Sequence, residues 1–174
     1  MDLSQARYIA DGVIAHLKPS SERIMIVGGI RRHKSDVHDI DICVIPRKDK
    51  LTDMFGQDAG EEVCAEFIQA VNCWTKIKGE PTGKYTQRLL PQMIKLEISI
   101  CDRATWPTIT LIRTGDAEFT HMLMKRALKL GFNQKDGLLW DGDKAVHLLD
   151  ETDYFRVLNL PFIIPEKRDK NAFK

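Results

Sequence analysis

The sequence has 174 residues, which is enough for one ordinary domain or for two small lobes that share a cleft. Hydrophobic residues make up 43% and charged residues 29% of the chain. This is the composition of a soluble globular protein, and it excludes a disordered chain, a collagen-like fibre or a disulfide scaffold. Because the formal net charge is only +1, any nucleic acid would have to be held by local clusters of Lys and Arg.

The cysteines and the hydropathy pattern indicate in which cellular compartment we expect the protein. None of the four cysteines is in a CxxC motif, so we expect buried free thiols rather than zinc ligands, at Cys43, Cys64, Cys73 and Cys101. The sequence has no long apolar run, which predicts neither a signal peptide nor a membrane span. We therefore expect an intracellular protein, in the cytoplasm or the nucleus.

The first elements in chain order are a helix and two strands. Apolar residues at helical spacing predict a helix over residues 3–17. The apolar run 23–27 predicts a buried strand that stops at a tight Gly28-Gly29 turn, and 40–45 predicts the matching second strand. The long polar connection between these strands is richer in basic residues than a simple turn requires.

The middle of the chain alternates between exposed and buried patterns. Residues 46–57 predict an exposed excursion, and 59–73 have the apolar spacing of a helix. The turn-rich segment 79–85 predicts a hairpin. Strict alternation over 92–101 predicts a strand with Glu97 on its polar face.

After a predicted lobe boundary near residue 105, the pattern changes to helices and short loops. We expect an amphipathic helix from Gly115-Asp116 to Gly131, a hairpin over 136–148 and a short helix over 151–158. The charged end of the chain, residues 166–174, predicts a mobile solvated tail.

The second predicted strand begins with a pair of acids. Residues two apart on a strand share a face, so Asp39 and Asp41 would lie side by side while Ile40 and Ile42 enter the core. Two such carboxylates repel each other unless a hard divalent cation lies between them, and Mg²⁺ is the usual one where triphosphates react. The alternative for an Asp-x-Asp on its own is a solvated strand edge.

The turn before this strand favours the metal interpretation. Glycines at Gly28 and Gly29 would let the backbone approach a phosphate closely. Arg31 or Arg32 can hold phosphate oxygens with a planar, two-pronged guanidinium. Glycines, arginines and acids in this order predict a cradle for a triphosphate.

Gly28-Gly29-Ile30-Arg31-Arg32, six further residues and Asp39-Ile40-Asp41 resemble the nucleotidyltransferase signature of X-family (beta-like) DNA polymerases. The resemblance continues through the C-terminal segment 155–168 and spans nearly the whole chain. It implies an α+β fold, with a palm of mixed sheet and helices on one face over 1–105 and a small α/β nucleotide-selection lobe over 106–174. Because the sequence shows no upstream lyase or helix-hairpin-helix segment, it resembles the minimal viral repair polymerases.

The resemblance also implies roles for particular residues. Asp39 and Asp41 would bridge two Mg²⁺ ions, for which Mn²⁺ can substitute, and Glu97 would be the third carboxylate. The nucleotide-binding set implied is Gly28, Gly29, Arg32, His38, Ile112, Arg113, Thr114 and Gly115. The chain departs from the family pattern by having Gly29 in place of Ser, His38 in place of Gly, Glu97 in place of Asp, and Ile112-Arg113 in place of two aromatics.

Basic residues near these motifs are the candidates for DNA contact. They lie in the loop after the glycines and on the helix after Gly115, and they are Arg31, His33, Lys34, His121 and Lys125. The alternative for each of them is a solvated side chain.

The resulting hypothesis is a monomeric, template-directed DNA polymerase that uses dNTPs and gapped or primer–template DNA to fill short gaps in repair, with no membrane partner. An alternative is a template-independent nucleotidyltransferase acting on RNA, a small molecule or a protein hydroxyl, which the near-neutral charge and the departures from the family pattern favour. A degenerate binding module ranks below both because the acids at 39, 41 and 97 are present.

Overall fold

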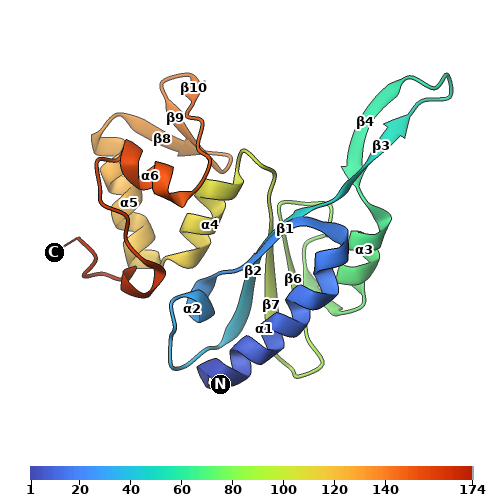
Figure 1. Ribbon diagram of the computed structural model, residues 1–174, viewed down its shortest axis with the longest axis horizontal. Coiled ribbons are helices and arrows are strands. Elements are labelled where there is room, and N and C mark those ends of the chain that lie inside the picture. The colour runs from blue at the N-terminus through green and yellow to red at the C-terminus, as the bar shows by residue number, and fades with distance from the viewer. Residues whose placement is uncertain (174) are drawn as a thin grey trace.

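A five-stranded sheet is the framework of the N-terminal part of the chain, as the computed structural model shows for the described residues 1–173 (Figure 1). The strand order is β1-β2-β7-β6-β5. The β2–β7 pair is parallel and the other neighbours are antiparallel, so the sheet is mixed. The elements of this part are α1 (Leu3–Leu17), β1 (Ser21–Ile26), α2 (Gly28–Arg31), β2 (Asp39–Pro46), β3 (Lys48–Thr52), β4 (Asp58–Val63), α3 (Ala65–Asn72), β5 (Thr75–Lys78), β6 (Tyr85–Leu89) and β7 (Lys95–Ile100).

The alternation along β2 decides which face of the sheet is buried. Ile40, Ile42 and Val44 are at most 1% exposed and join the apolar side chains of α1 and α3 in one core. Asp39 and Asp41 are half-buried on the opposite face. The predicted division of this strand into a core face and an acidic face is confirmed.

A second core lies in the C-terminal lobe. It is built from α5, α6 and a three-stranded sheet of order β10-β9-β8. The elements of this lobe are α4 (Trp106–Thr114), α5 (Ala117–Lys129), β8 (Phe132–Lys135), β9 (Leu138–Asp141), β10 (Lys144–Ala145) and α6 (Glu151–Val157). The predicted helix after Gly115 is confirmed as α5, whose first turn is capped by Asp116 through a 2.8 Å bond from the Phe119 amide.

Helix α4 connects the two cores. Trp106 at its start is 2% exposed and packs with Val27 and Cys43 under the palm sheet. Leu111, later in the same helix, packs in the core of the C-terminal lobe. A helix shared in this way fixes the lobe against the sheet, because moving it would disturb both cores.

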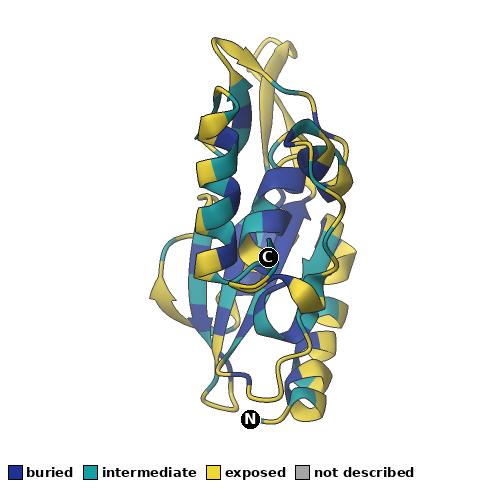
Figure 2. Cartoon of the chain, turned by 90° about the vertical axis from the view of Figure 1, so that its left-hand side faces the viewer, coloured by how far each residue is buried: buried dark blue, intermediate teal, exposed yellow. Residues whose placement is uncertain are grey.

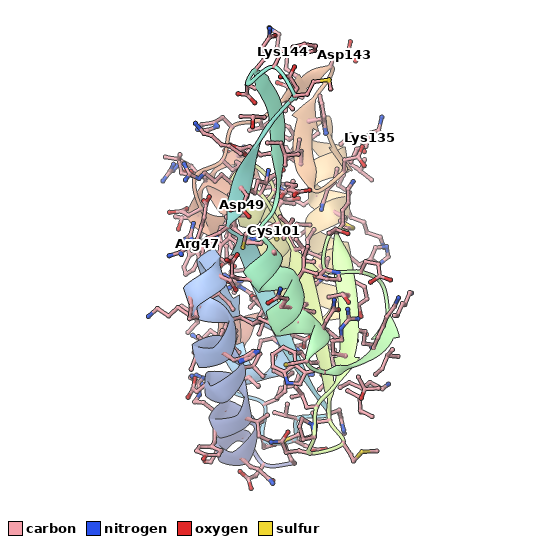
Figure 3. All side chains as sticks on the ribbon, turned by 90° about the vertical axis from the view of Figure 1, so that its right-hand side faces the viewer. Arg47, Asp49, Cys101, Lys135, Asp143 and Lys144 are labelled. Atoms are coloured by element: carbon pink, nitrogen blue, oxygen red, sulfur yellow. The ribbon has the colours of Figure 1, made fainter. Side chains whose placement is uncertain are left out.

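Two local predictions were wrong. The helix predicted over 59–73 is wrong in its first part, because residues 59–63 belong to β4 and pair with β3 in a hairpin that stands away from the body (Figure 1). Gly60 has φ +103, which a helix does not allow, and the strands of the hairpin are coloured as exposed in Figure 2. Figure 3 shows the hairpin from the side, with Arg47 where it leaves the body and Asp49 on it. Gly28-Gly29 begins the short helix α2 instead of a tight turn.

The exposure of two further parts of the chain was also predicted wrongly. Cys73 is exposed, although the other three cysteines are buried as predicted. The C-terminal segment was predicted to be a mobile tail, but Arg168 is 0% exposed and Phe173 stacks on Phe119 at 5.6 Å. Its buried cation and aromatic ring therefore make this segment part of the lobe's core. Within residues 1–173, no helix has the length and apolar character to cross a membrane.

Candidate active site

Three carboxylates lie on the polar face of the palm sheet. Asp39 and Asp41 lie on β2, and Glu97 lies directly opposite Asp41 on the parallel neighbour β7. All three are half-buried. Neighbouring positions on adjacent strands face the same way, so the structure brings Glu97 to the pair of acids as the resemblance implied.

The negative charges of these acids repel one another, and the repulsion raises the pKa of Asp41. The pKa of Asp41 is raised to about 7, first by burial and then by the negative charges of Asp39 and Glu97. Arg113 and Arg32 act in the opposite direction, but they do not outweigh these causes. The site therefore has uncompensated negative charge, which a bound cation would neutralise.

Gly28 is required by the close approach of Asp41. Its φ is +62, and a Cβ built on it would lie 1.9 Å from Oδ2 of Asp41, so no larger residue fits there. Gly29 differs, because its Cβ would meet only the Lys34 side chain at 3.8 Å, an ordinary contact. The Ser that the family pattern has at position 29 would therefore meet no close neighbour in this fold.

The two arginines after the glycines connect the palm with the C-terminal lobe. Arg32 donates a hydrogen bond to the carbonyl of Thr114, and Arg31 donates to the hydroxyl of the same residue at 2.7 Å. Burial lowers the pKa of Arg32, while the nearby Asp116 and Asp41 charges partly offset this effect. Arg32 is thus held near the acids with its guanidinium partly desolvated, and a guanidinium in such a setting is suited to bind an anion.

A buried ion-pair network extends from Arg31. Its second guanidinium nitrogen donates to Glu151 at 3.0 Å, and Arg168 donates to the same carboxylate oxygen at 2.9 Å. Burial raises the pKa of Glu151, but the hydrogen bonds from Arg31 and Arg168 outweigh burial and leave this pKa below its ordinary value. Sequence reasoning missed this network, since Glu151 appeared only as the first residue of a predicted helix.

The predicted nucleotide residues of α4 lie beside the acids. Ile112, Arg113 and Gly115 line a shallow pocket of about 370 Å³ together with Asp41 and His121. Thr114 is buried and is bonded to both arginines. The pocket therefore joins a palm acid to the first turn of the lobe.

The other predicted site residues are at the surface. His38 is 83% exposed and lies 3.4 Å from Asp36. His33 lies 3.5 Å from Glu166, so it faces the C-terminal lobe. Lys34 and Lys125 are exposed. The structure leaves a role of these residues in DNA or nucleotide binding as a prediction.

Two residues that the sequence did not single out contact the third carboxylate. Gln87 on β6 donates from Nε2 to Oε1 of Glu97 at 3.0 Å. Tyr85 on the same strand has its pKa raised to about 12 by burial and then by hydrogen bonding to Glu97. The Arg113 guanidinium lies 5.3 Å from the centre of the Tyr85 ring. Finding these contacts needs the pairing register of β6 with β7, which the sequence pattern does not contain.

The acidic site suits a magnesium ion in ligand type and charge. Over residues 1–173, no three His, Cys, Asp or Glu side chains converge closely enough to enclose a metal by themselves. Asp39, Asp41 and Glu97 offer the oxygen ligands and negative charge that a hard cation prefers. Mg²⁺ commonly takes one or two carboxylates and completes its coordination with substrate phosphates and water, so an open set of acids fits it.

Comparison with known proteins supports the resemblance to beta-like DNA polymerases independently of the site geometry. Residues 109–169 match the family described as DNA polymerase beta thumb. The structure of Leishmania infantum polymerase beta in a ternary P/T complex has a TM-score of 0.75 at 19% identity, covering 97% of this chain and 76% of that one. The ternary gap complex of the same polymerase has a TM-score of 0.76 at 18% identity, covering 97% and 70%. No curated protein matches the chain in sequence.

The family match identifies residues 109–169 as a polymerase beta thumb, and this segment follows the mixed sheet that carries the acids. The two solved structures share their fold with 97% of this chain, so the chain has the fold of polymerase beta. The predicted α+β fold is confirmed, and the thumb match over residues 109–169 agrees with the predicted resemblance to beta-like polymerases. The boundary at residue 105 stays a prediction.

Proposed function

We propose that this chain is a template-directed DNA polymerase that adds dNTPs to a primer 3′-hydroxyl and fills short gaps during repair. The observation that carries the proposal is the pairing of Asp41 with Glu97 beside a pocket whose other wall is the start of the thumb. Acids on the palm and a nucleotide-sized hollow against the thumb are the arrangement that positioning of a triphosphate requires.

Arg32 and Gly28 are the residues we propose to bind the triphosphate. The Arg32 guanidinium is kept near Asp41 by its bond to Thr114, with other donors free for phosphate oxygens. Gly28 leaves room for the backbone to approach both Asp41 and a phosphate. Together they would orient the α-phosphate toward the primer end.

The proposed reaction is an in-line displacement. The primer 3′ oxygen bonds to the α-phosphorus, the bond from that phosphorus to the bridging oxygen breaks, and pyrophosphate leaves. Glu97, beside Asp41, would accept the proton of the 3′-hydroxyl. Two Mg²⁺ ions held by Asp39, Asp41 and Glu97, or Mn²⁺ in their place, would supply Lewis-acid stabilisation of the charge that develops.

DNA would be held by exposed basic residues close to the pocket. His121 lines the pocket, and Lys125 follows four residues later on the same exposed face of α5. Arg31 is less available because Glu151 and Thr114 engage it. We also propose that the enzyme works as a monomer in a reducing, intracellular compartment; the three buried free cysteines support the reducing compartment.

A 5′-phosphorylated, one-nucleotide-gapped DNA is the substrate for the test. Purified protein with MgCl₂ is given each of the four dNTPs against each of the four template bases. The variant Asp39→Asn, Asp41→Asn removes the charges of the proposed metal ligands at constant volume. Asp11→Asn makes the same chemical change at an exposed position on α1 and serves as the control.

Template-matched extension by the wild type and by Asp11→Asn, but not by the double variant, would support the proposal. Extension that ignores the template would refute template direction and favour the template-independent transferase, whose RNA and small-molecule acceptors would be assayed next. Full activity of the double variant would show that the acids of β2 do not catalyse the reaction.

A further inference from the structure

Strand β6 carries a support for the third carboxylate. We propose that Gln87 and Tyr85 are positioning residues that hold Glu97 in the orientation needed to act on the primer end. The inference rests on the proposed function, because it assigns these residues to the same site. It concerns how this chain uses a glutamate, which is longer than the aspartate of the family pattern.

A glutamate at this position needs external support. Its side chain has one more rotatable bond than an aspartate, so its carboxylate can occupy more positions, and fixing it costs more conformational entropy. Glu97 is only half-buried, so packing alone does not confine it. A displacement of about 1 Å at a catalytic group can reduce the rate about 100-fold, so the carboxylate must be held in place.

Gln87 provides the direct hydrogen bond. It is the cross-strand partner of Glu97 in the antiparallel β6–β7 pair, so the two side chains leave the sheet on the same face. Its Nε2 donates to Oε1 of Glu97 at 3.0 Å. One carboxylate oxygen is thereby engaged, which leaves Oε2 as the oxygen to face the substrate.

Tyr85 is a second neighbour of Glu97 on the same face. It pairs with Ser99 and is therefore the diagonal neighbour of Glu97, within reach of an aromatic side chain. Its ring lies under the Arg113 guanidinium at 5.3 Å, so the ring is confined between the sheet and the end of α4. Because Arg113 also lines the pocket with Asp41, this contact connects the support of Glu97 to the nucleotide side of the site.

Strand β6 is rigid enough to serve as this support. Arg88, the residue after Gln87, points to the other face and is 0% exposed. It donates to the Gly79 carbonyl at 3.2 Å and to Asn72 Oδ1 at 3.0 Å, which ties β6 to the preceding turn and to the end of α3. A donor on an anchored strand holds its acceptor more accurately than one on a loop.

The competing interpretation is that these bonds only satisfy half-buried polar groups. Such a structural role would lower stability when Gln87 or Tyr85 is changed, whatever residue occupies position 97. A positioning role acts through Glu97 alone. An aspartate at 97 is one methylene shorter and falls short of the Gln87 amide, so the two interpretations differ in that background.

The test is a double-mutant cycle with Gln87→Leu and Glu97→Asp. In the wild-type background, we expect Gln87→Leu to lower kcat about 10- to 100-fold, as for loss of a group that orients a metal ligand, and to change KM for dNTP less than about twofold. In the Glu97→Asp background, we expect Gln87→Leu to have no further effect. Tyr85→Phe should also lower kcat in the wild-type background, by a smaller factor, and should have no further effect in the Glu97→Asp background. Gln92→Leu, the same change at an exposed turn position, is the control.

Mn²⁺ affinity, measured from the EPR signal of the free ion, is a second readout that requires no turnover. Gln87→Leu should weaken Mn²⁺ binding about 10-fold in the wild-type background and leave it unchanged with Asp at position 97. Equal losses in both backgrounds would overturn the inference and assign Gln87 a structural role. If the wild type extends no primer, the proposed function fails, while the Mn²⁺ cycle still decides the positioning role.

Discussion

Replacing Asp41 by Asn should stabilise the metal-free protein at alkaline pH. The pKa of Asp41 is raised from 3.8 to about 7, so the folded state binds a proton that the unfolded chain has lost between about pH 4 and 7. The wild type therefore loses stability as pH rises through this window. The difference between these two pKa values corresponds to about 4 kcal/mol, and structural relaxation reduces this figure, so we expect a gain of about 2–4 kcal/mol at pH 8.

Urea denaturation in EDTA at pH 4.5 and pH 8 measures the effect. Asp41→Asn should exceed the wild type at pH 8 and come within about 1 kcal/mol of it at pH 4.5, where the folded acid is already neutral. Asp39→Asn should give a smaller gain, because it removes only one of the charges that raise the Asp41 pKa. Equal or lower stability of Asp41→Asn at pH 8 would refute the argument that repulsion and burial strain this site.

Three further changes test other parts of the structure. Gly28→Ala should reduce dNTP incorporation more than about 100-fold because its Cβ displaces Asp41, whereas Gly29→Ala should keep activity within a few-fold; single-turnover kinetics compares them. Glu151→Gln should lower the free energy of unfolding by about 3 kcal/mol, since the buried Arg168 and the half-buried Arg31 lose their counter-charge; an unchanged urea midpoint would contradict this. Arg88→Met should cost about 2 kcal/mol, because the carbonyl and amide oxygens that it bonds lose their donor, and thermal melting should show the loss without a change in KM.

Local periodicity was enough to predict the acidic half of the site. Asp39 and Asp41 alternate with Ile40 and Ile42, and a period of two settles which side faces the core wherever one face is buried. The helix after Gly115 was equally readable, because a capping Asp116 precedes its apolar stripe. Both features depend on neighbours within a few residues of each other.

Contacts between distant segments were beyond the sequence pattern. The bond from Gln87 to Glu97 depends on the register of β6 against β7, and a one-residue slip would turn Gln87 to the other face. Glu151 meets Arg31 only because the lobe folds back onto the palm. The helix predicted over 59–73 was wrong in its first part because cross-strand pairing of β3 and β4 overrode a helical spacing of few apolar residues.

The ion pair between Arg31 and Glu151 has a consequence for the order of folding. Its partners are 120 residues apart, so this contact closes a loop of most of the chain. Contacts of such long sequence separation form late, because chain entropy must be lost before they can form. During synthesis from the N-terminus, the palm sheet has all its strands once residue 100 is made, while Arg31 still lacks its partner. The segment from Gly28 to Arg32 should therefore reach its final geometry as one of the last events in folding, after the sheet that carries the acids.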